Sequence, residues 1–541
     1  MILNEEQEAA ANAIDGVFVV ISGPGSGKTT ILIERYMKML IRGIQQKDIL
    51  NLTFTNAAAT ELVKRAGLIN ADSTFRTFHS FAMELLKKER ENLSFKLCET
   101  IIPTSMEDYK LLFDLVKSYP AINNYRTLKE RISEWKRTSV EPDQAIDDAQ
   151  FSKGLDYYYA HAYKDYETRC REEGWLDFDS LMREAVQLLE TNNEVRNRWK
   201  RKYISVDECQ DTDITQFKLL QLIFDGNIFA VGDENQLIYE WRSAQAGNLT
   251  NFERLFPNAT KLYMGQNYRS TKRLVEFFRE IIPVDNGIAS RMATVNDIGL
   301  EPTITRYRDD QEEAVQVLRK IDAPIQSAVL ARTNRALFIF QRICTTRGIK
   351  YKILGKKDFW EQNEVKKLLH LAKESNDMRP ANQVLSSLIS SHNLLNIYRG
   401  SGNLNDGDPV ENLNSIVKMA VGKGTIPEFL DRLRKLTHGR KSAKGLTLST
   451  VHQAKGREWD HVYVIGVSQG RMPHKDGETA EEKRIFFVAC SRAAKTLNIS
   501  FFGNHSEFLN DYVEDINDYE PEVGEVSEDP NQIPSAIPIS D

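Results

Sequence analysis

Short apolar runs alternate with helical patterns along most of the chain and predict β-sheets flanked by helices. Residues 17–21 form a continuous apolar run between two glycines, which is typical of a buried parallel strand. In residues 29–40 apolar side chains recur at helical spacing. Comparable strand-like runs follow at residues 49–54, 203–206, 228–231, 328–330, 446–450 and 461–465. The pattern predicts an α/β fold with open, mostly parallel sheets.

Three segments depart from this alternation. Residues 81–170 are rich in Lys, Glu, Tyr and Leu and lack strand signals, and residues 374–444 have a helical or irregular pattern. We interpret both as helical insertions into α/β cores. After about residue 507 the sequence is acidic, contains proline and has no periodicity, which predicts a flexible tail.

The composition is that of a globular protein with several domains. The chain has 541 residues, 41% hydrophobic and 27% charged, and at roughly 150 residues per domain it should form about three or four domains. It lacks a run of about 18 apolar residues, and its acidic residues 1–8 do not resemble a signal peptide. The five cysteines lack the CxxC spacing of metal or disulfide sites. We therefore expect a soluble, reduced, cytoplasmic protein.

The net charge of −6 is unevenly distributed. All 71 Lys and Arg residues lie at or before Lys495, whereas 11 of the 77 acidic residues lie after it. The first 495 residues therefore carry 71 basic and 66 acidic side chains, a net charge of about +5. A mildly basic body is compatible with a nucleic-acid groove, but solvated surface has the same composition.

A glycine-rich segment between the first predicted strand and helix has the pattern of a phosphate-binding loop. Its glycines let backbone N–H groups surround phosphate oxygens, and the following helix directs its positive dipole end toward them. Lys28 would reach the β- and γ-phosphates, and the Thr29 hydroxyl would bind Mg²⁺. The alternative is a glycine-rich turn without a ligand, which the flanking strand and helix disfavour. The predicted nucleotide-binding residues of this segment are Ser22, Gly23, Pro24, Gly25, Ser26, Gly27, Lys28, Thr29 and Thr30.

A second apolar strand, residues 203–206, ends in two adjacent acids. Such acids emerge at the carboxyl edge of a parallel sheet, where ligands bind in open α/β folds. Asp207 would bind Mg²⁺, and Glu208 would polarise the attacking water. Taken alone, a strand followed by two acids is more typical of an ordinary surface, and the pair gains weight only from the motifs around it.

Further motifs resemble those of superfamily 1 DNA helicases of the UvrD/Rep/PcrA type. Residues 206–213 (VDECQDTD) are similar to the Walker B motif of that family, and residues 231–242 (VGDENQLIYEWR) to its third motif. Other similar motifs occur in family order at residues 3–7, 53–56, 77–80, 176–179, 266–271, 450–458 and 488–493. The resemblance covers both predicted α/β cores and is specific because so many motifs occur in order.

This resemblance implies two RecA-like P-loop NTPase domains, each with a helical insertion, and ATP bound between the two domains. The implied ATP-binding domain 1A comprises residues 1–86 and 169–274, with insertion 1B at 87–168. Domain 2A comprises residues 275–374 and 440–505, with a reduced insertion 2B at 375–439. Residues 506–541 form the acidic tail.

The resemblance also assigns roles around the nucleotide. Gln7 would recognise adenine, and Tyr268 would stack on the base. Arg35 would lie beside the nucleotide, and Glu458 would contact its ribose side. The residues that would sense or neutralise the γ-phosphate are Gln236, Arg269 and Arg492. Gln7 has an alternative role, since Asn4 followed by Gln7 resembles a helix N-cap box. If the second domain supplies Arg492, hydrolysis depends on domain closure.

Single-stranded DNA would cross both domains in this family. The candidate stacking residues are Phe54, Tyr239 and Trp241, because aromatic rings bind bases without reading sequence. Candidate backbone contacts are Asn56, His79, Arg242 and His452. Each has a structural alternative: an aromatic next to a strand is often core, and a single histidine is often structural. The histidines lack Cys or carboxylate partners at ligand spacing, so no metal site is assigned to them.

The chain departs from the family at several places. Ala57 stands where the family usually has a phosphate-contacting lysine. The second insertion is much shorter than a full 2B subdomain and lacks its Gly-Ile-Gly turn, so the duplex grip and the autoinhibition attributed to 2B are in doubt. An acidic tail replaces the basic, Tudor-like extension of some relatives.

We therefore expect an ATP- and Mg²⁺-dependent 3′→5′ DNA helicase and single-stranded DNA translocase that acts in DNA repair or replication. The expected substrates are single strands and junctions with duplex, and RNA is an alternative track because stacking discriminates sugars poorly. A protein partner could bind the acidic tail or 2B. A first rival is a motor that strips proteins from single strands, or serves a nuclease or defence complex, without processive unwinding. A second rival is a nucleotide-gated binding module, which Glu208, Arg269 and Arg492 disfavour.

Overall fold

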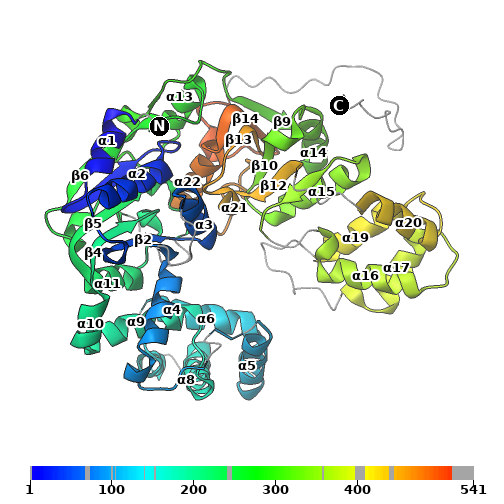
Figure 1. Ribbon diagram of the computed structural model, residues 1–541. Coiled ribbons are helices and arrows are strands. Elements are labelled where there is room, and N and C mark those ends of the chain that lie inside the picture. Colours follow the sequence, from blue (N-terminus) through cyan, green and yellow to red (C-terminus); the bar gives the residue numbers. More distant parts are fainter. Residues whose placement is uncertain are drawn as a thin grey trace. The chain divides into compact units, whose positions relative to one another are not determined.

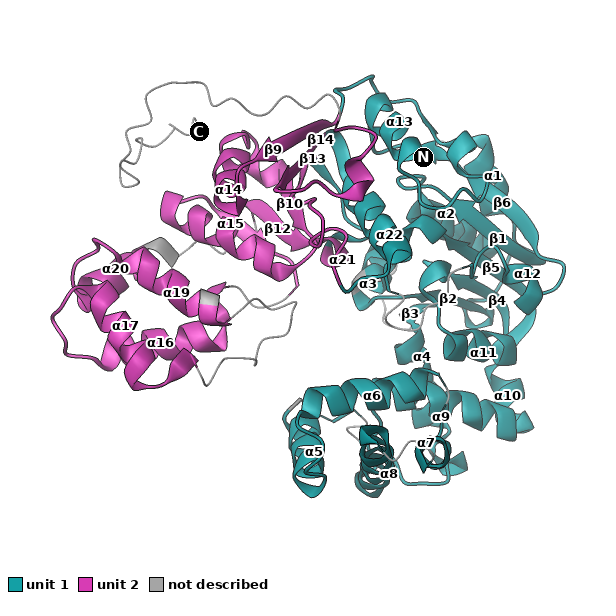
Figure 2. Cartoon of the chain, turned by 180° about the vertical axis from the view of Figure 1, so that it is seen from behind, with its two compact units in different colours: residues 1–301, 454–460, 476–496 teal, residues 302–453, 461–475, 497–541 magenta. Residues whose placement is uncertain are grey.

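The computed structural model describes residues 3–67, 74–98, 102–103, 105–138, 140–150, 154–239, 247–355, 359–395, 409–437 and 444–513. The chain forms two compact units (Figure 2). Unit 1 contains residues 1–301, 454–460 and 476–496, and unit 2 contains residues 302–453, 461–475 and 497–541. Most of the predicted acidic tail lies outside the described residues.

Unit 1 is built on a six-stranded sheet with the strand order β3-β2-β4-β5-β1-β6, in which all neighbouring strands are parallel (Figure 1). The strands are β1 (Val17–Ser22), β2 (Ile49–Thr53), β3 (Phe75–Thr77), β4 (Arg201–Val206), β5 (Phe224–Gly232) and β6 (Thr260–Met264). Apart from the first helical insertion described below, the other α-helices and strands of this unit are α1 (Glu5–Asn12), α2 (Lys28–Ile41), α3 (Asn56–Arg65), α4 (Phe78–Lys88), α9 (Phe178–Thr191), α10 (Asn193–Trp199), α11 (Ile214–Ile223), α12 (Phe252–Leu255), α13 (Lys272–Glu280), α22 (Thr479–Cys490), β7 (Gln266–Asn267) and β8 (Ala293–Thr294).

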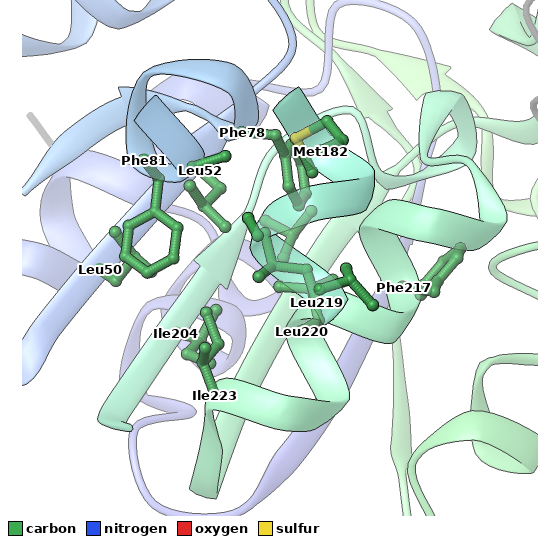
Figure 3. Packing of buried hydrophobic residues seen from close by; sticks show 14 of the residues in the cluster. Leu50, Leu52, Phe78, Phe81, Met182, Ile204, Phe217, Leu219, Leu220 and Ile223 are labelled. Atoms are coloured by element: carbon green, nitrogen blue, oxygen red, sulfur yellow. The ribbon is translucent and has the colours of Figure 1, made fainter. Parts of the chain in front are cut away.

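Both faces of this sheet are buried, which explains the continuous apolar runs in the sequence. Along β1, Val19 belongs to one hydrophobic cluster and Val20 to another. Neighbouring residues of a strand point to opposite faces, so the two clusters cover opposite faces of the sheet. Figure 3 shows the first cluster, where Leu50 and Ile204 of the sheet pack near Phe81 and Leu220 of the helices.

Unit 2 contains most of a second six-stranded sheet with the order β11-β12-β10-β13-β14-β9, of which the first residues of β13 and β14 are assigned to unit 1. Its strands are β9 (Thr303–Tyr307), β10 (Ser327–Ala331), β11 (Tyr351–Ile353), β12 (Leu446–Thr450), β13 (Trp459–Val464) and β14 (Ala493–Phe502). Helices α14 (Asp310–Arg319) and α15 (Asn334–Arg347) contribute to the core on this sheet, and the short helix α21 (Val451–Ala454) follows β12. The two parallel sheets with flanking helices confirm the predicted α/β fold class.

Helical clusters with their own cores occupy both predicted insertions. The first comprises α5 (Ser105–Ser118), α6 (Tyr125–Arg137), α7 (Pro142–Gln150) and α8 (Leu155–Glu173). The second comprises α17 (Ala381–Ser391), α19 (Pro409–Ala420) and α20 (Ile426–Thr437). Its core also includes α16 (Asn363–Glu374), which lies just before the predicted insertion. The four-domain boundaries remain a prediction. Three segments that this prediction assigned to domain 2A cluster with unit 1, namely residues 275–301, 454–460 and 476–496. None of the helices in the described residues is both long and apolar enough to cross a membrane.

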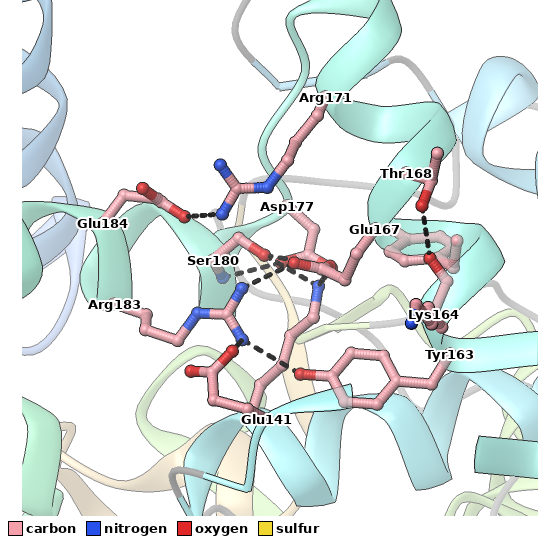
Figure 4. A network of polar contacts seen from close by, with 12 residues as sticks. Glu141, Tyr163, Lys164, Glu167, Thr168, Arg171, Asp177, Ser180, Arg183 and Glu184 are labelled. Carbon is pink, nitrogen blue, oxygen red and sulfur yellow. Dashed lines mark hydrogen bonds and ion pairs between the residues drawn. The ribbon is translucent and has the colours of Figure 1, made fainter. Parts of the chain in front are cut away.

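A buried ionic cluster joins the first insertion to α9 (Figure 4). The Lys136 ammonium on α6 is fully buried and lies 2.5 Å from Glu167 and 2.6 Å from Asp177. Glu167 also pairs with Arg183, at 2.5 Å. Burial alone would raise the pKa of Asp177, but Lys136 and the hydrogen bonds from Ser180 outweigh it and lower this pKa to about 2. This carboxylate therefore stabilises the fold at neutral pH, and that contribution is lost as the pH falls toward 2.

Replacing Lys136 with methionine is expected to weaken this junction by about 3–5 kcal/mol, because the carboxylates of Asp177 and Glu167 would stay buried without their cation. Amide hydrogen exchange in α6 and α8 should become faster in this variant. A matched control is Lys164→Met, which removes an exposed lysine 2.7 Å from Asp143 and should have little effect on stability, because exposed ion pairs contribute little. Equal exchange rates in both variants would contradict the prediction.

Candidate functional site

The glycine-rich segment forms a tight loop between β1 and α2. The Ser22 hydroxyl donates to the Gly232 carbonyl at 2.7 Å, and the Ser26 hydroxyl donates to the Gly23 carbonyl at 2.8 Å. Gly27 is the N-cap of α2 with φ +90° and no capping side chain, so a residue with a Cβ would be strained here. The first backbone N–H groups of α2 therefore remain available to an anion. Lys28, Thr29 and Thr30 form the half-buried first turn.

Two distant segments pack against this loop. The Gln7 side chain closes a capping box with Asn4 and also donates from Nε2 to the Ser26 carbonyl at 2.9 Å. The expected N-cap role of Gln7 is thus present together with a contact to the loop. On the other side, Asn267 donates to the Pro24 carbonyl at 2.8 Å, and the Tyr268 amide donates to the Gly25 carbonyl at 2.9 Å.

Tyr268 and Arg269 follow Asn267 directly in the sequence and are therefore held close to the loop. The Tyr268 side chain is 42% exposed, so its ring is accessible. A Cβ on Gly25 would lie 2.9 Å from the Arg269 Cβ, which explains why this loop position requires glycine.

The two acids after β4 lie at the carboxyl edge of the sheet. The Asp207 amide donates to the Leu52 carbonyl at 2.8 Å. Glu208 has φ +49°, an uncommon left-handed conformation that stores strain and occurs often at functional sites. Its carboxylate accepts a hydrogen bond from Gln210 at 2.7 Å.

Buried acids and two lysines lie close together at the carboxyl edge of the sheet, and these charges shift the pKa values of the acids. Burial and the charge of Glu208 raise the pKa of Asp207. Burial opposes ionisation of Glu208 too, but the positive charges of Lys28 and Lys455 keep the pKa of Glu208 low. Asp211 and Asp233 are also buried, and burial raises the pKa of each.

The buried carboxylates suit a divalent cation. Magnesium prefers carboxylate and hydroxyl oxygens, and Asp207 with Thr29 at the first turn of α2 supplies that chemistry. Buried acids that otherwise depend on lysine charges gain stability from such an ion. Within the described residues, no group of three or more His, Cys, Asp or Glu side chains is arranged as a metal site. The donor set therefore fits an ion that takes its other ligands from phosphate and water.

Gln236 connects the acidic edge to Arg492. Its Nε2 donates to Asp233 at 2.7 Å, and its Oε1 accepts from the Arg492 guanidinium at 3.1 Å. Arg492 is 1% exposed and is also held by the Val488 carbonyl at 2.9 Å. Burial and the charge of Arg269 lower the pKa of Arg492 to about 9.

Arg269 lies beside Glu458 in the same unit. Its Nε is 2.6 Å from the Glu458 carboxylate, and its Nη1 donates to the Ser491 carbonyl at 2.9 Å. The structure thus brings Lys28, Glu208, Gln236, Arg269, Glu458 and Arg492 into one compact unit. They come from segments almost 500 residues apart.

Arg35 occupies a structural position. Its guanidinium is completely buried and donates to Ser205 at 2.9 Å and to the Ala13 carbonyl at 2.9 Å. It lies over the Phe229 ring at 4.8 Å, and burial lowers its pKa to about 10. These contacts favour a role in joining α1, α2 and the sheet. The predicted position beside the nucleotide remains a prediction.

Two of the candidate stacking residues lie together. The Phe54 ring, just after β2, stacks on Tyr239 with centroids 5.4 Å apart and an angle of 23°. Both rings are half-buried. We call them the aromatic pair. Trp241 and Arg242 lie outside the described residues.

The other candidate DNA-contacting residues lie on three different helices. Asn56 is exposed at the start of α3. His79 on α4 packs edge-to-face against Phe178, which is 57% exposed. His452 is half-buried on α21, in unit 2.

Two residues with buried side chains near this site, Lys455 and Asp211, are not among the predicted site residues. Lys455 pairs with Asp211 at 2.5 Å and donates to the Gln236 carbonyl at 2.7 Å. Asp211 lies in the motif at residues 206–213 and Lys455 in the motif at residues 450–458, so these motifs were the sequence signal that could have identified them. Their partnership spans 244 positions and could be found only in three dimensions.

A parallel sheet, a phosphate loop, acids at the strand ends and two arginines define a P-loop NTPase. Comparison with known proteins narrows this class. The UvrD/REP helicase N-terminal domain family matches residues 3–257, and the UvrD-like helicase C-terminal domain family matches residues 262–392 and 390–504. The chain belongs to the UvrD/Rep helicase family, and its two sheets are the RecA-like folds of that family.

Similar proteins cover most of the chain. The ATP-dependent DNA helicase PcrA of Bacillus subtilis is 26% identical over 92% of this chain and 82% of its own length. PcrA of Staphylococcus aureus is 25% identical over 92% of this chain and 83% of its own length. The ATP-dependent DNA helicase Rep of Buchnera aphidicola is 30% identical over 68% of this chain and 57% of its own length. The family predicted from the sequence motifs is confirmed.

Proposed function

We propose that this chain is an ATP-dependent DNA helicase that translocates along single-stranded DNA with 3′→5′ polarity. The observation that carries the proposal is the contact of Arg492 with Gln236 in the same unit as Lys28 and Glu208. A γ-phosphate bound at the loop would lie near a general base, Glu208, and near the sensor Gln236. Two arginines, Arg269 and Arg492, would complete its surroundings. The polarity follows from the family alone.

In the proposed mechanism, the N–H groups at the start of α2 and the Lys28 ammonium hold the β- and γ-phosphates. Gln7 and Tyr268 contact the adenine base. A bound Mg²⁺ would be held by Thr29 and Asp207, and would neutralise charge on the phosphate oxygens. Glu208 orients the attacking water and accepts its proton. Arg269 and Arg492 stabilise the charge that develops on the transferring phosphoryl group.

The position of Gln236 supports a coupling between ATP hydrolysis and DNA binding. It lies three residues before Tyr239, whose ring belongs to the aromatic pair. We propose that the bases of a single strand stack on this pair, with Trp241 continuing the platform. Asn56, His79, Arg242 and His452 would contact the backbone. Movement of the two RecA-like domains during hydrolysis would then advance the strand.

The short second insertion favours a second function. In the described residues between 375 and 437 it consists of α17, α19 and α20, which share a core with α16. A motor with so small an insertion could strip proteins from single strands, or drive a nuclease or defence complex, without processive unwinding.

The assignment predicts that single-stranded DNA raises ATP turnover and that duplexes with 3′ tails are unwound while those with 5′ tails are not. Coupled ATPase assays with oligothymidine and strand-separation assays with the two tailed duplexes test it. Binding should weaken by about 10³-fold or more between 50 and 200 mM salt if six or more phosphates are contacted. Stimulated turnover without strand separation would support the stripping motor. Turnover that is indifferent to DNA would contradict both functions.

The wider assignments are proposals on the same basis. We propose a cytoplasmic protein that acts in DNA repair or replication on single strands and junctions. We also propose the division into domains 1A, 1B, 2A and 2B given above, with a partner site on 2B or on the acidic tail.

A further inference from the structure

Three cations from the last part of unit 1 hold the short segment 236–239, which we call the link segment. Lys455 donates to the Gln236 carbonyl at 2.7 Å. Arg484 on α22 donates to the Leu237 carbonyl at 2.7 Å, and Arg492 donates to the Gln236 side chain at 3.1 Å. The backbone between the γ-phosphate sensor and Tyr239 is therefore fixed at two successive residues.

Lys455 is the one of these three cations that contacts an acid, the link segment and the Tyr239 ring in the described residues. Its ammonium is 2.5 Å from the Asp211 carboxylate and 5.0 Å from the centroid of the Tyr239 ring. Its side chain is only 7% exposed. One charge therefore contacts an acid three residues after Glu208, the link segment and a ring of the aromatic pair.

The Lys455 ammonium is costly to displace. Asp211 is buried, and its Oδ1 accepts no hydrogen bond among the described residues. Removal of the ammonium would leave a buried carboxylate without compensation. Movement of the ammonium away from Asp211 is therefore unfavourable. A cation on the face of an aromatic ring also stabilises that ring's position.

A base that stacks on Tyr239 would compete for the ring surface that Phe54 and Lys455 now contact. The ring or the ammonium must shift, and the link segment shifts with either of them. Gln236 would then change its position relative to Arg492 and the γ-phosphate.

We propose that Lys455 is a positioning residue that transmits base stacking at the aromatic pair to the placement of Gln236 and Arg492. The proposal rests on the proposed function, because it assumes that DNA stacks on Tyr239. Lys455 acts through the link segment and needs no contact with the strand. Its removal should uncouple turnover from DNA while leaving DNA affinity largely intact.

The test compares Lys455→Met with Lys455→Arg and with the matched control Lys218→Met. Lys218 is a half-exposed lysine on α11 that lies 2.8 Å from Glu190. For each protein, ATP turnover is measured with and without oligothymidine. The affinity for the same oligothymidine is measured by fluorescence anisotropy.

In Lys455→Met, the stimulation of kcat by oligothymidine is expected to fall by about tenfold, with DNA affinity within about threefold of the unmodified chain. Lys455→Arg should recover part of the stimulation, because a guanidinium can pair with Asp211 and lie on Tyr239. Lys218→Met should match the unmodified chain. A purely structural role would lower turnover with and without DNA by the same factor.

Three outcomes would overturn the inference. The first is an unchanged stimulation factor in Lys455→Met. The second is an equal loss of basal and stimulated turnover. The third is a loss of DNA affinity large enough to account for the lost stimulation. If the unmodified chain itself shows no stimulation, the proposed function fails and the inference fails with it.

Discussion

Replacement of Glu208 by glutamine is expected to lower kcat for ATP hydrolysis by about 10²- to 10⁴-fold, because the amide cannot accept the proton of the attacking water. Glutamine has nearly the same volume and can keep a hydrogen bond to Gln210, which now lies 2.7 Å from the carboxylate. ATP binding should therefore persist, and fluorescent nucleotide titration should give an affinity close to that of the unmodified chain. Steady-state turnover with saturating oligothymidine measures the loss.

The control is Glu190→Gln, which makes the same change on the exposed side of α9. Its kcat should stay within about twofold of the unmodified value, since surface substitutions have small effects. A Glu208→Gln protein that binds nucleotide and turns it over at the normal rate would remove Glu208 from the catalytic role. Loss of nucleotide binding would instead point to a structural role at the strand end.

Replacement of Arg492 by alanine is expected to lower kcat by about 10³-fold or more, because arginines that contact the transferring phosphoryl group provide rate factors of that size. The KM for ATP should change much less, since this contact strengthens only in the transition state. Lysine should not restore the rate. The Arg492 guanidinium bonds Gln236 and the Val488 carbonyl at the same time, a geometry that an ammonium cannot reproduce.

Because Arg492 is buried, its removal could also loosen the fold. The Arg492→Lys variant helps to distinguish a loss of stability from a loss of catalysis, since it keeps a cation at the same position. Thermal unfolding of both variants, compared with Arg196→Ala at a half-buried position of α10, separates stability from chemistry. If Arg492→Lys retains normal kcat, or if KM rises in proportion to the loss of kcat, the assignment to transition-state stabilisation is wrong.

The fold was predictable where sequence signals are local. The apolar run of β1, the glycine loop and the periodicity of α2 identify one α/β unit without any neighbour. The two helical insertions were visible as long segments without strand runs. The motifs likewise gave Lys28, Asp207 and Glu208, because their chemistry depends on residue type and on the edge of a parallel sheet.

The parts that escaped prediction depend on contacts between distant segments. The family resemblance placed Arg35 beside the nucleotide, whereas only the fold shows that its guanidinium donates to Ala13 and Ser205. Gln7 had two readings from sequence, and the structure gives it both a cap and a loop contact. The Lys455–Asp211 pair has no sequence signature, because its spacing reflects tertiary packing alone.

The late segments of unit 1 also bear on how the enzyme is made. Residues 454–460 and 476–496 complete a unit that begins at the N-terminus. A nascent chain on the ribosome therefore carries the phosphate loop long before it carries Arg492. Unit 1 therefore acquires Lys455 and Arg492, and with them the contacts to Gln236, only when almost the whole sequence has been synthesised.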